Sequence, residues 1–308
     1  MNTARSLLLV AAVGASVRAA EPIVCAGPAM GTTYRVTLAG PIAGMSAGEV
    51  HRDLDRLLAR LDRELSTWRD DSDATRFNRA AAGEWVEIGP GLADVLDTAR
   101  RVHDESDGAF DITAGSLLRL LHEGGEPSAA RLADVRTRVG MPLIDVRPAT
   151  ADHAAAVRKQ ADGVELDLNG IGPGYAVDRI GERLAELGSA NHLVELGGEV
   201  RAWGSRAADE PWRVRLRGSQ HSDRTLALPS GTALATASIG PARTLVDPRT
   251  AHAIAGPPRS ITVQADTCAR ADAWAVAALI LQLESDPTGI LPVARTPEQP
   301  AGSTRKSR

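Results

Sequence analysis

Aromatic side chains and lysines are scarce in this chain of 308 residues. Phe, Trp and Tyr together make up 3% of the sequence. Only two lysines, Lys159 and Lys306, accompany many arginines, which we attribute to coding bias rather than to function. No basic stripe is present, and its absence argues against nucleic acid as a partner. Long apolar runs are missing beyond the N-terminal residues, so we expect no transmembrane anchor.

Cysteines are equally few. Cys25 and Cys268 could form a disulfide in an oxidising compartment, or both could remain free thiols. The apolar neighbours of Cys268 are typical of a thiol that is simply buried. Both alternatives therefore stay open at this point.

The N-terminus has the pattern of an export signal. Arg5 precedes a short apolar run over residues 6–17, and Val17-Arg18-Ala19 fits a cleavage site with small flanking residues. We predict a signal peptide over residues 1–19 and a periplasmic or otherwise exported protein. An ordinary buried N-terminal helix is the alternative.

The remaining composition is that of a globular protein. Apolar residues make up 43% and charged residues 24% of the chain. Strand-like and helix-like patterns alternate along it, and hairpin-like pairs in the middle favour an α+β fold. Residues 284–308 are rich in Pro, Thr and Arg and lack periodicity, so we predict a disordered tail.

Hydrophobic spacing predicts most of the individual elements. Ser46 and Glu49 form a capping box at the start of a long amphipathic helix. Further helices are expected over residues 92–102, 177–187 and 269–283. Strands are expected over residues 33–38, 164–168, 192–195, 199–203, 212–216 and 261–265.

A glycine-rich turn separates the predicted strand at residues 164–168 from the following helix. Its sequence from Asp167 is Asp-Leu-Asn-Gly-Ile-Gly-Pro-Gly-Tyr. Backbone N–H groups in such a turn can face phosphate. A Rossmann dinucleotide turn is one alternative, but Tyr175 occupies the place where the third glycine is needed. A purely structural turn is the other.

Asp272 lies inside the apolar stretch that opens the last predicted helix. A buried carboxylate is costly unless it is paired or bound to a metal. Mg²⁺ prefers oxygen ligands and usually shares them with substrate phosphates. The alternative is that Asp272 only caps the start of the helix.

Two of the rare aromatic residues lie in connecting segments. Phe110 follows the Asp107-Gly108 turn, where filling the core is its default role. Trp68 comes directly after the long helix and could either stack on a planar ring or cover the core.

Eight short motifs follow one another along the chain. They are Met30-Gly31-Thr32-Thr33-Tyr34, Leu65-Ser66-Thr67-Trp68, Arg76-Phe77-Asn78, Gly108-Ala109-Phe110-Asp111, the stretch from Asp167 to Asp178, Glu195-Leu196-Gly197-Gly198-Glu199, Asp247-Pro248-Arg249-Thr250 and Ala271-Asp272-Ala273-Trp274-Ala275. Together they resemble the ApbE family of FAD:protein FMN transferases. The resemblance implies an α+β domain over residues 28–283, with two subdomains around a central cleft.

The resemblance also implies a reaction. Such enzymes bind FAD with Mg²⁺ at its pyrophosphate and transfer FMN to a threonine or serine hydroxyl of an exported acceptor protein, releasing AMP. In this class of chemistry a metal neutralises phosphate charge and a base takes the hydroxyl proton.

The family's site residues can be carried over by position. Those expected to line the FAD site are Met30, Trp68, Ala109, Phe110, Asp111, Asp167, Pro173 and Val246. The metal positions are the backbone carbonyl of Gly170, the carboxylate of Asp272 and the side chain at Val276.

This sequence departs from the family at functionally important positions. Val276 replaces a threonine and has no oxygen to offer a metal, and Thr244 replaces a histidine that could act as a base. His252 is a weak substitute candidate, so we assign no catalytic base. Pro173 replaces a polar residue and lacks an N–H group. An impaired transferase, a non-catalytic FAD-binding protein and, less favoured, a Rossmann-type oxidoreductase are the three hypotheses.

Overall fold

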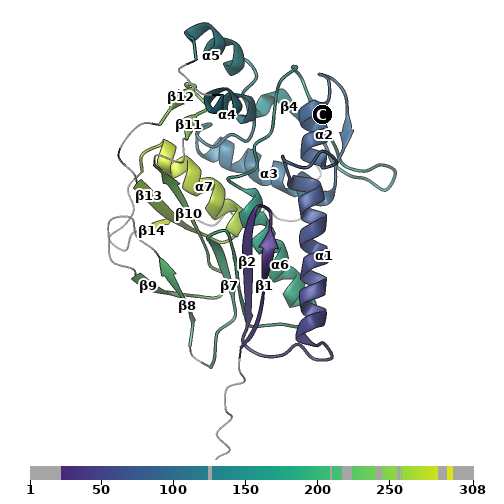
Figure 1. Ribbon diagram of the computed structural model, residues 1–308, viewed down its shortest axis with the longest axis vertical. Helices are drawn as coiled ribbons and strands as arrows, with labels where there is room; N and C mark the ends of the chain where they lie inside the picture. The colour runs from purple at the N-terminus through teal and green to yellow at the C-terminus, as the bar shows by residue number, and fades with distance from the viewer. Residues whose placement is uncertain are drawn as a thin grey trace, which may run out of the picture.

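The computed structural model describes residues 22–123, 127–208, 210–216, 224–240, 245–254, 257, 259–283 and 290–293. Within these ranges the chain forms an α+β fold (Figure 1). The predicted signal peptide at residues 1–19 and the base position Thr244 lie outside the described residues.

Helices and strands alternate along most of the chain. The helices are α1 (Ala47–Leu65), α2 (Asp73–Arg79), α3 (Pro90–Glu105), α4 (Gly115–His122), α5 (Ala129–Arg136), α6 (Gly172–Glu186) and α7 (Cys268–Ile280), with a 3₁₀ turn at Met141–Leu143. The strands are β1 (Ile23–Ala29), β2 (Thr32–Leu38), β3 (Val86–Glu87), β4 (Ile144–Arg147), β5 (Ala156–Lys159), β6 (His192–Leu196), β7 (Glu199–Trp203), β8 (Trp212–Leu216), β9 (Arg224–Leu228), β10 (Ala233–Ile239), β11 (Val246–Asp247), β12 (His252–Ala253), β13 (Arg259–Ala265) and β14 (Ile290–Pro292).

A seven-stranded sheet in the order β1-β2-β6-β7-β10-β13-β14 forms the centre of the molecule. Neighbouring strands are antiparallel except for β13 and β14, which are parallel. Helices α1, α6 and α7 lie along one face of this sheet (Figure 1). The β8–β9 hairpin contributes Trp212 and Leu228 to an apolar cluster with Val200 and Leu234. A small sheet in the order β3-β5-β4 packs near α2. The β11–β12 pair packs near α4, since Val246 of β11 and Leu117 of α4 belong to one apolar cluster.

The largest apolar core joins the central sheet to α1, α3, α6 and α7. It runs from Tyr34 in β2 through Leu54 in α1 and Leu96 in α3 to Ile180 in α6 and Ala271 in α7. These elements therefore share one interior, while the clusters around Trp212 and around Val246 are separate from it. The division into two subdomains around a cleft remains a prediction.

The start of α1 follows directly from its sequence. The Ser46 hydroxyl accepts the Glu49 amide at 3.3 Å, and the Glu49 carboxylate accepts the Ser46 amide at 2.8 Å. Val50, Leu54 and Leu61 then place the apolar stripe against the core. The predicted capping box is confirmed.

The start of α3 depends on a carboxylate from another helix. Buried Glu64 of α1 accepts the Gly91 amide at 2.6 Å. A Cβ atom on Gly91 would lie 2.6 Å from the same carboxylate oxygen, and one on Gly89 would lie 2.5 Å from Glu64 Cδ. Glycine is therefore needed at both positions for Glu64 to act as the cap.

Several predictions about elements are wrong. Residues 164–168 form no regular strand, because their only sheet-like pairing is an isolated bridge between Ala114 and Glu165. The predicted disordered tail contains strand β14 at Ile290–Pro292, while residues 284–289 and 294–308 lie outside the described ones. The Rossmann alternative also fails, because the central sheet is mainly antiparallel.

The two cysteines lie in different elements of the fold. Cys25 of β1 and Cys268 at the start of α7 are both buried free thiols. The structure therefore contains no disulfide between them in the part of the chain that it describes. Among the described helices, none has the length and hydropathy needed to cross a membrane.

Candidate functional site

Segments that are far apart in sequence meet around the start of α6. Met30 lies in the turn of the β1–β2 hairpin, with a φ of 48°, and its Cε atom would be 3.7 Å from a Cβ atom on Gly172. A Cβ atom on Gly170 would lie 2.9 Å from Val276 Cγ2 and 3.5 Å from Phe110 Cε2. Four separately predicted site positions are thus neighbours in space.

Asp272 belongs to the same neighbourhood. It lies one helical turn before Val276, on the same face of α7. Its side chain is buried, with 6% exposure, and Oδ2 accepts the Gly174 amide at 3.2 Å. Thr267 is the N-cap of α7, since its side chain accepts the Arg270 amide. Asp272 therefore caps the first turn of α6 and not the start of its own helix.

The oxygen atoms of this group fit a magnesium ion only in part. The Asp272 carboxylate and the Gly170 backbone carbonyl are ligands of the kind that Mg²⁺ prefers. Val276 presents a methyl group to Gly170 where the family position would offer an oxygen. Among the described residues, no three His, Cys, Asp or Glu side chains cluster as a metal site. A bound Mg²⁺ would therefore take its other ligands from water or from a phosphate-bearing molecule.

The glycine-rich turn has little capacity to hold phosphate through its N–H groups. The acceptors of its amides are Asp167 Oδ1 for Asn169 at 2.8 Å, the Leu168 carbonyl for Ile171 at 3.2 Å and for Gly172 at 2.8 Å, and Asp272 for Gly174. Pro173, in the first turn of α6, has no N–H to offer. The expectation that these amides face phosphate is therefore wrong for four of the turn's positions.

Asp167 lies beside the segment that contains Phe110. Its backbone amide donates to the Ile112 carbonyl at 2.7 Å, which joins the glycine-rich turn to the connection after α3. Burial raises the pKa of the Asp167 carboxyl group. The structure thus keeps Asp167 near the predicted site, half-buried and hydrogen-bonded to Asn169.

Burial and internal hydrogen bonds fix the segment from Ala109 to Asp111. Ala109 and Phe110 are buried, and Asp111 accepts the Thr113 amide at 2.8 Å and the Thr113 hydroxyl at 2.6 Å. His103 Nδ1 lies 3.3 Å from Asp111 Oδ2, and this contact raises the pKa of the His103 imidazole. We did not predict a role for His103. Its partner Asp111 follows an irregular turn, and helical or strand spacing therefore does not indicate that the two residues meet.

The buried Lys159 holds the backbone just before the glycine-rich turn. Lys159 Nζ donates to the Asn78 carbonyl at 2.9 Å and to the Val164 carbonyl at 2.8 Å, and it lies 4.9 Å from the centre of the Phe77 ring. Asn78 also pairs with both backbone groups of Leu166, at 2.7 and 3.1 Å. Our attribution of the lysine pattern to coding bias therefore misses the structural role of Lys159. The only hint in the sequence is that Lys159 is one of two lysines among many arginines.

Other predicted site residues are not part of this group. Trp68 lies in the α1–α2 connection with 87% exposure, so its ring is not packed against the start of α6. Val246 is buried in a separate cluster with Leu117 and Ala251. His252 is exposed in β12, where its backbone pairs with that of Asp247.

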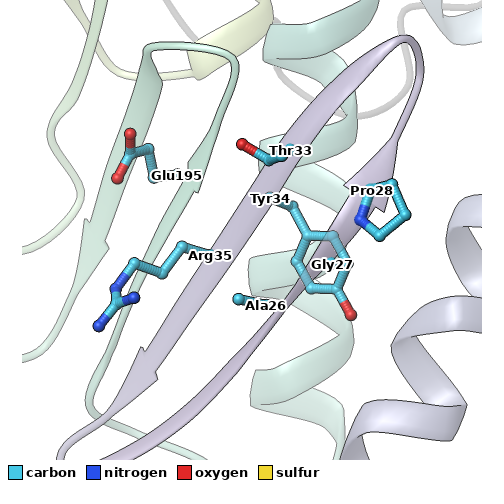
Figure 2. Close-up of a pocket in the computed structure, with 7 residues that line it drawn as sticks. All are labelled: Ala26, Gly27, Pro28, Thr33, Tyr34, Arg35 and Glu195. Carbon is cyan, nitrogen blue, oxygen red and sulfur yellow. The ribbon is translucent and has the colours of Figure 1, made fainter.

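A shallow depression of about 490 Å³ lies elsewhere, over strands β1, β2 and β6 (Figure 2). Its lining residues are Ala26, Gly27, Pro28, Thr33, Tyr34, Arg35 and Glu195. Arg35 and Glu195 are direct cross-strand neighbours, and none of the predicted site residues contributes to the depression. We therefore place the candidate site at the start of α6, where the buried carboxylate and the predicted residues meet.

Comparison with known proteins gives a consistent result. The sequence profile described as the ApbE family matches residues 30–290. A protein of Haemophilus influenzae named FAD:protein FMN transferase is 30% identical, over 84% of this chain and 80% of its own length. The protein of the same name from Escherichia coli strain K12 is 28% identical, over 87% and 80%.

Solved structures also resemble this fold. The flavinyl transferase ApbE of Pseudomonas stutzeri, in its apo form, matches with a TM-score of 0.75 and 30% identity, over 85% of this chain and 84% of its own. The flavin transferase ApbE of Vibrio cholerae matches with a TM-score of 0.75 and 26% identity, over 85% and 87%. Because the profile covers most of the sequence, the chain belongs to the ApbE family.

Proposed function

We propose that this protein transfers FMN from FAD to a threonine or serine hydroxyl of an exported acceptor protein, with Mg²⁺, and releases AMP. The observation that carries the proposal is the meeting of Met30, Phe110, Gly170 and Val276 with the buried carboxylate of Asp272. The names of the relatives support the same reaction. We also propose that residues 1–19 direct export.

The reaction exchanges the phosphoanhydride bond of FAD for a phosphate ester on the acceptor. The acceptor oxygen forms a bond to the phosphorus of the FMN portion, the bond from that phosphorus to the AMP oxygen breaks, and the hydroxyl proton passes to a base or to water. Mg²⁺, when bound, would neutralise charge on the diphosphate. Asp272 and the Gly170 carbonyl would hold it. A cation is especially needed here because four amides of the glycine-rich turn already have acceptors.

The remaining family positions complete the proposed FAD site. They are Ala109, Asp111, Asp167 and Pro173, whereas Trp68 and Val246 lie apart from this group and stay predicted positions only. Their backbone groups can contribute as well as their side chains, since Ala109 and Phe110 are buried and the Asp111 carboxylate is already hydrogen-bonded.

The base is the weakest part of the proposed machinery. A threonine hydroxyl such as that of Thr244 is not a base near neutral pH. The absence of a positioned base typically costs about 10²- to 10⁴-fold in rate. We therefore expect slow transfer, with water accepting the proton.

A second candidate function is FAD binding without transfer. The observation that favours it is Val276, whose methyl group occupies the position of a metal ligand in the family. In this case the protein would retain FAD in the presence of Mg²⁺ without modifying an acceptor.

The two functions are separated by one experiment. The mature protein is incubated with FAD, Mg²⁺ and an exported acceptor, and the acceptor mass is measured. We expect a gain of one FMN, which EDTA and Asp272→Ala abolish. Asp97→Ala, which removes an exposed carboxylate paired with Arg101 on α3, is the matched control and should retain transfer.

Each possible outcome contradicts or favours one of the two functions. Transfer that persists in EDTA or in Asp272→Ala would contradict the metal-dependent mechanism. FAD bound by the wild-type protein without any mass gain in the acceptor would favour the second function.

A further inference from the structure

The first turns of α6 and α7 hold each other through reciprocal hydrogen bonds. Asp272 of α7 accepts the Gly174 amide of α6 at 3.2 Å. In return, Asp178 of α6 accepts the Cys268 and Ala269 amides of α7, both at 2.9 Å. Each helix thus supplies the carboxylate that caps the other one.

The two helices touch through their backbones at this point. A Cβ atom on Gly174 would lie 2.4 Å from the Cys268 carbonyl oxygen. The contact therefore requires glycine at position 174, and α7 has no room to move closer to α6. A small displacement of α7 in the other direction would lengthen the bond from Gly174 to Asp272.

The central sheet fixes Asp178 in turn. Arg201 of β7 donates from Nη1 to Asp178 Oδ1 at 2.6 Å, and its guanidinium lies 4.7 Å from the centre of the Trp203 ring. Trp203 packs directly on the backbone of α6, since a Cβ atom on Gly181 would lie 2.0 Å from its ring. Asp178 has 5% exposure, so this carboxylate has little access to water.

We propose that Asp178 is a positioning residue, which holds the first turn of α7 so that Asp272 faces the cation site. The inference rests on the proposed function, because it assigns Asp178 to the metal that Asp272 would bind. Asp178 acts through the backbone of Cys268 and Ala269, one turn before Asp272. Groups that orient a metal ligand commonly change metal affinity about 10- to 100-fold when they are removed.

The test is the Mg²⁺ affinity of the full mature chain, measured by calorimetric titration at saturating FAD and well below the unfolding temperature. Asp178→Asn keeps the shape and one acceptor oxygen, but it leaves one of the two α7 amides without an acceptor. We expect its Mg²⁺ affinity to fall about tenfold. Arg201→Met, which removes the anchor of Asp178, should weaken binding in the same direction and serves if the first variant does not fold.

Glu64→Gln is the matched control. Glu64 is also a buried carboxylate that caps a helix, but it caps α3 through Gly91. This variant should lose stability and keep its Mg²⁺ affinity within about twofold, since Glu64 has no contact with the first turn of α7 that resembles that of Asp178.

Three results would overturn the inference in distinguishable ways. Unchanged Mg²⁺ affinity in folded Asp178→Asn or Arg201→Met would contradict it alone. An equal loss of affinity in Glu64→Gln would show that any loss of stability produces the effect. A wild-type protein that binds neither FAD nor Mg²⁺ would contradict the proposed function, and this inference with it.

Discussion

Replacing Val276 by threonine should add an oxygen to the proposed cation site at little cost to the fold. Val276 is half-buried, and its Cγ2 atom faces Gly170. Threonine has nearly the same shape, and one of its rotamers places the hydroxyl where Cγ2 now lies. The hydroxyl proton can be donated to the carbonyl of Asp272, four residues earlier in the helix, which leaves the oxygen lone pairs available.

The expected magnitude follows from this geometry. A buried hydroxyl without a partner would cost about 1–3 kcal/mol, but the Asp272 carbonyl satisfies it, so we expect a stability change below about 1 kcal/mol. The new ligand replaces a water molecule on Mg²⁺. A gain of about 1.4 kcal/mol in Mg²⁺ binding corresponds to a tenfold higher affinity.

The assay is Mg²⁺ titration at saturating FAD, together with the rate of FMN transfer and the midpoint of urea unfolding. Val276→Thr should raise both Mg²⁺ affinity and transfer rate. Val276→Ala is the control, because it removes the methyl groups without adding an oxygen and should only destabilise the protein, by about 1 kcal/mol. If Val276→Thr leaves Mg²⁺ affinity and transfer rate unchanged in a folded protein, the placement of the metal beside Val276 is refuted.

Two further predictions concern residues that the sequence did not single out. Glu64→Ala should destabilise the protein by about 1–3 kcal/mol in urea unfolding, because the buried Gly91 amide loses its acceptor; an unchanged midpoint would contradict the capping role. Asp111 raises the pKa of His103, so the contribution of this pair to stability should be present below pH ~6.5 and lost as the pH rises through the raised folded value. His103→Gln should remove this pH dependence, measured as the difference in unfolding midpoint between acidic and alkaline buffers, and a wild-type difference that survives in the variant would refute the assignment.

The sequence predicted elements well wherever one face of an element is buried and the other is not. The long helix α1 shows this pattern, because Leu54, Leu58 and Leu61 alternate with charged residues at helical spacing and Ser46 caps the start. The predicted strands at β6 and β7 are confirmed for the same reason. Local pattern and tertiary burial agree at these places.

Strand β10 shows why other elements escaped prediction. Its sequence from Ala233 to Ile239 is Ala-Leu-Ala-Thr-Ala-Ser-Ile, which has weak strand propensity. Small side chains are needed there because the alanine-rich helix α7 packs against β10 and β13. The strand is stabilised by its neighbours on both sides and by the helix above it, none of which is visible in a local window.

The candidate site was predictable in its residues but not in its hydrogen bonds. The resemblance to the ApbE family indicated Met30, Phe110, Gly170 and Asp272, which the structure brings together. The acceptor of the Gly174 amide could not be predicted, because it depends on the distance between α6 and α7. Long-range partners of this kind are a property of the packed fold.

These hydrogen bonds change the physical interpretation of the turn. A glycine-rich turn at a helix start usually offers unpaired N–H groups to an anion. Here Asp272 takes the Gly174 amide, and Pro173 removes a second donor. One carboxylate and one carbonyl are too few ligands for the proposed Mg²⁺, so phosphate and water would have to complete its coordination. The metal and the flavin dinucleotide should therefore bind as a linked pair, each raising the affinity of the other by the same factor.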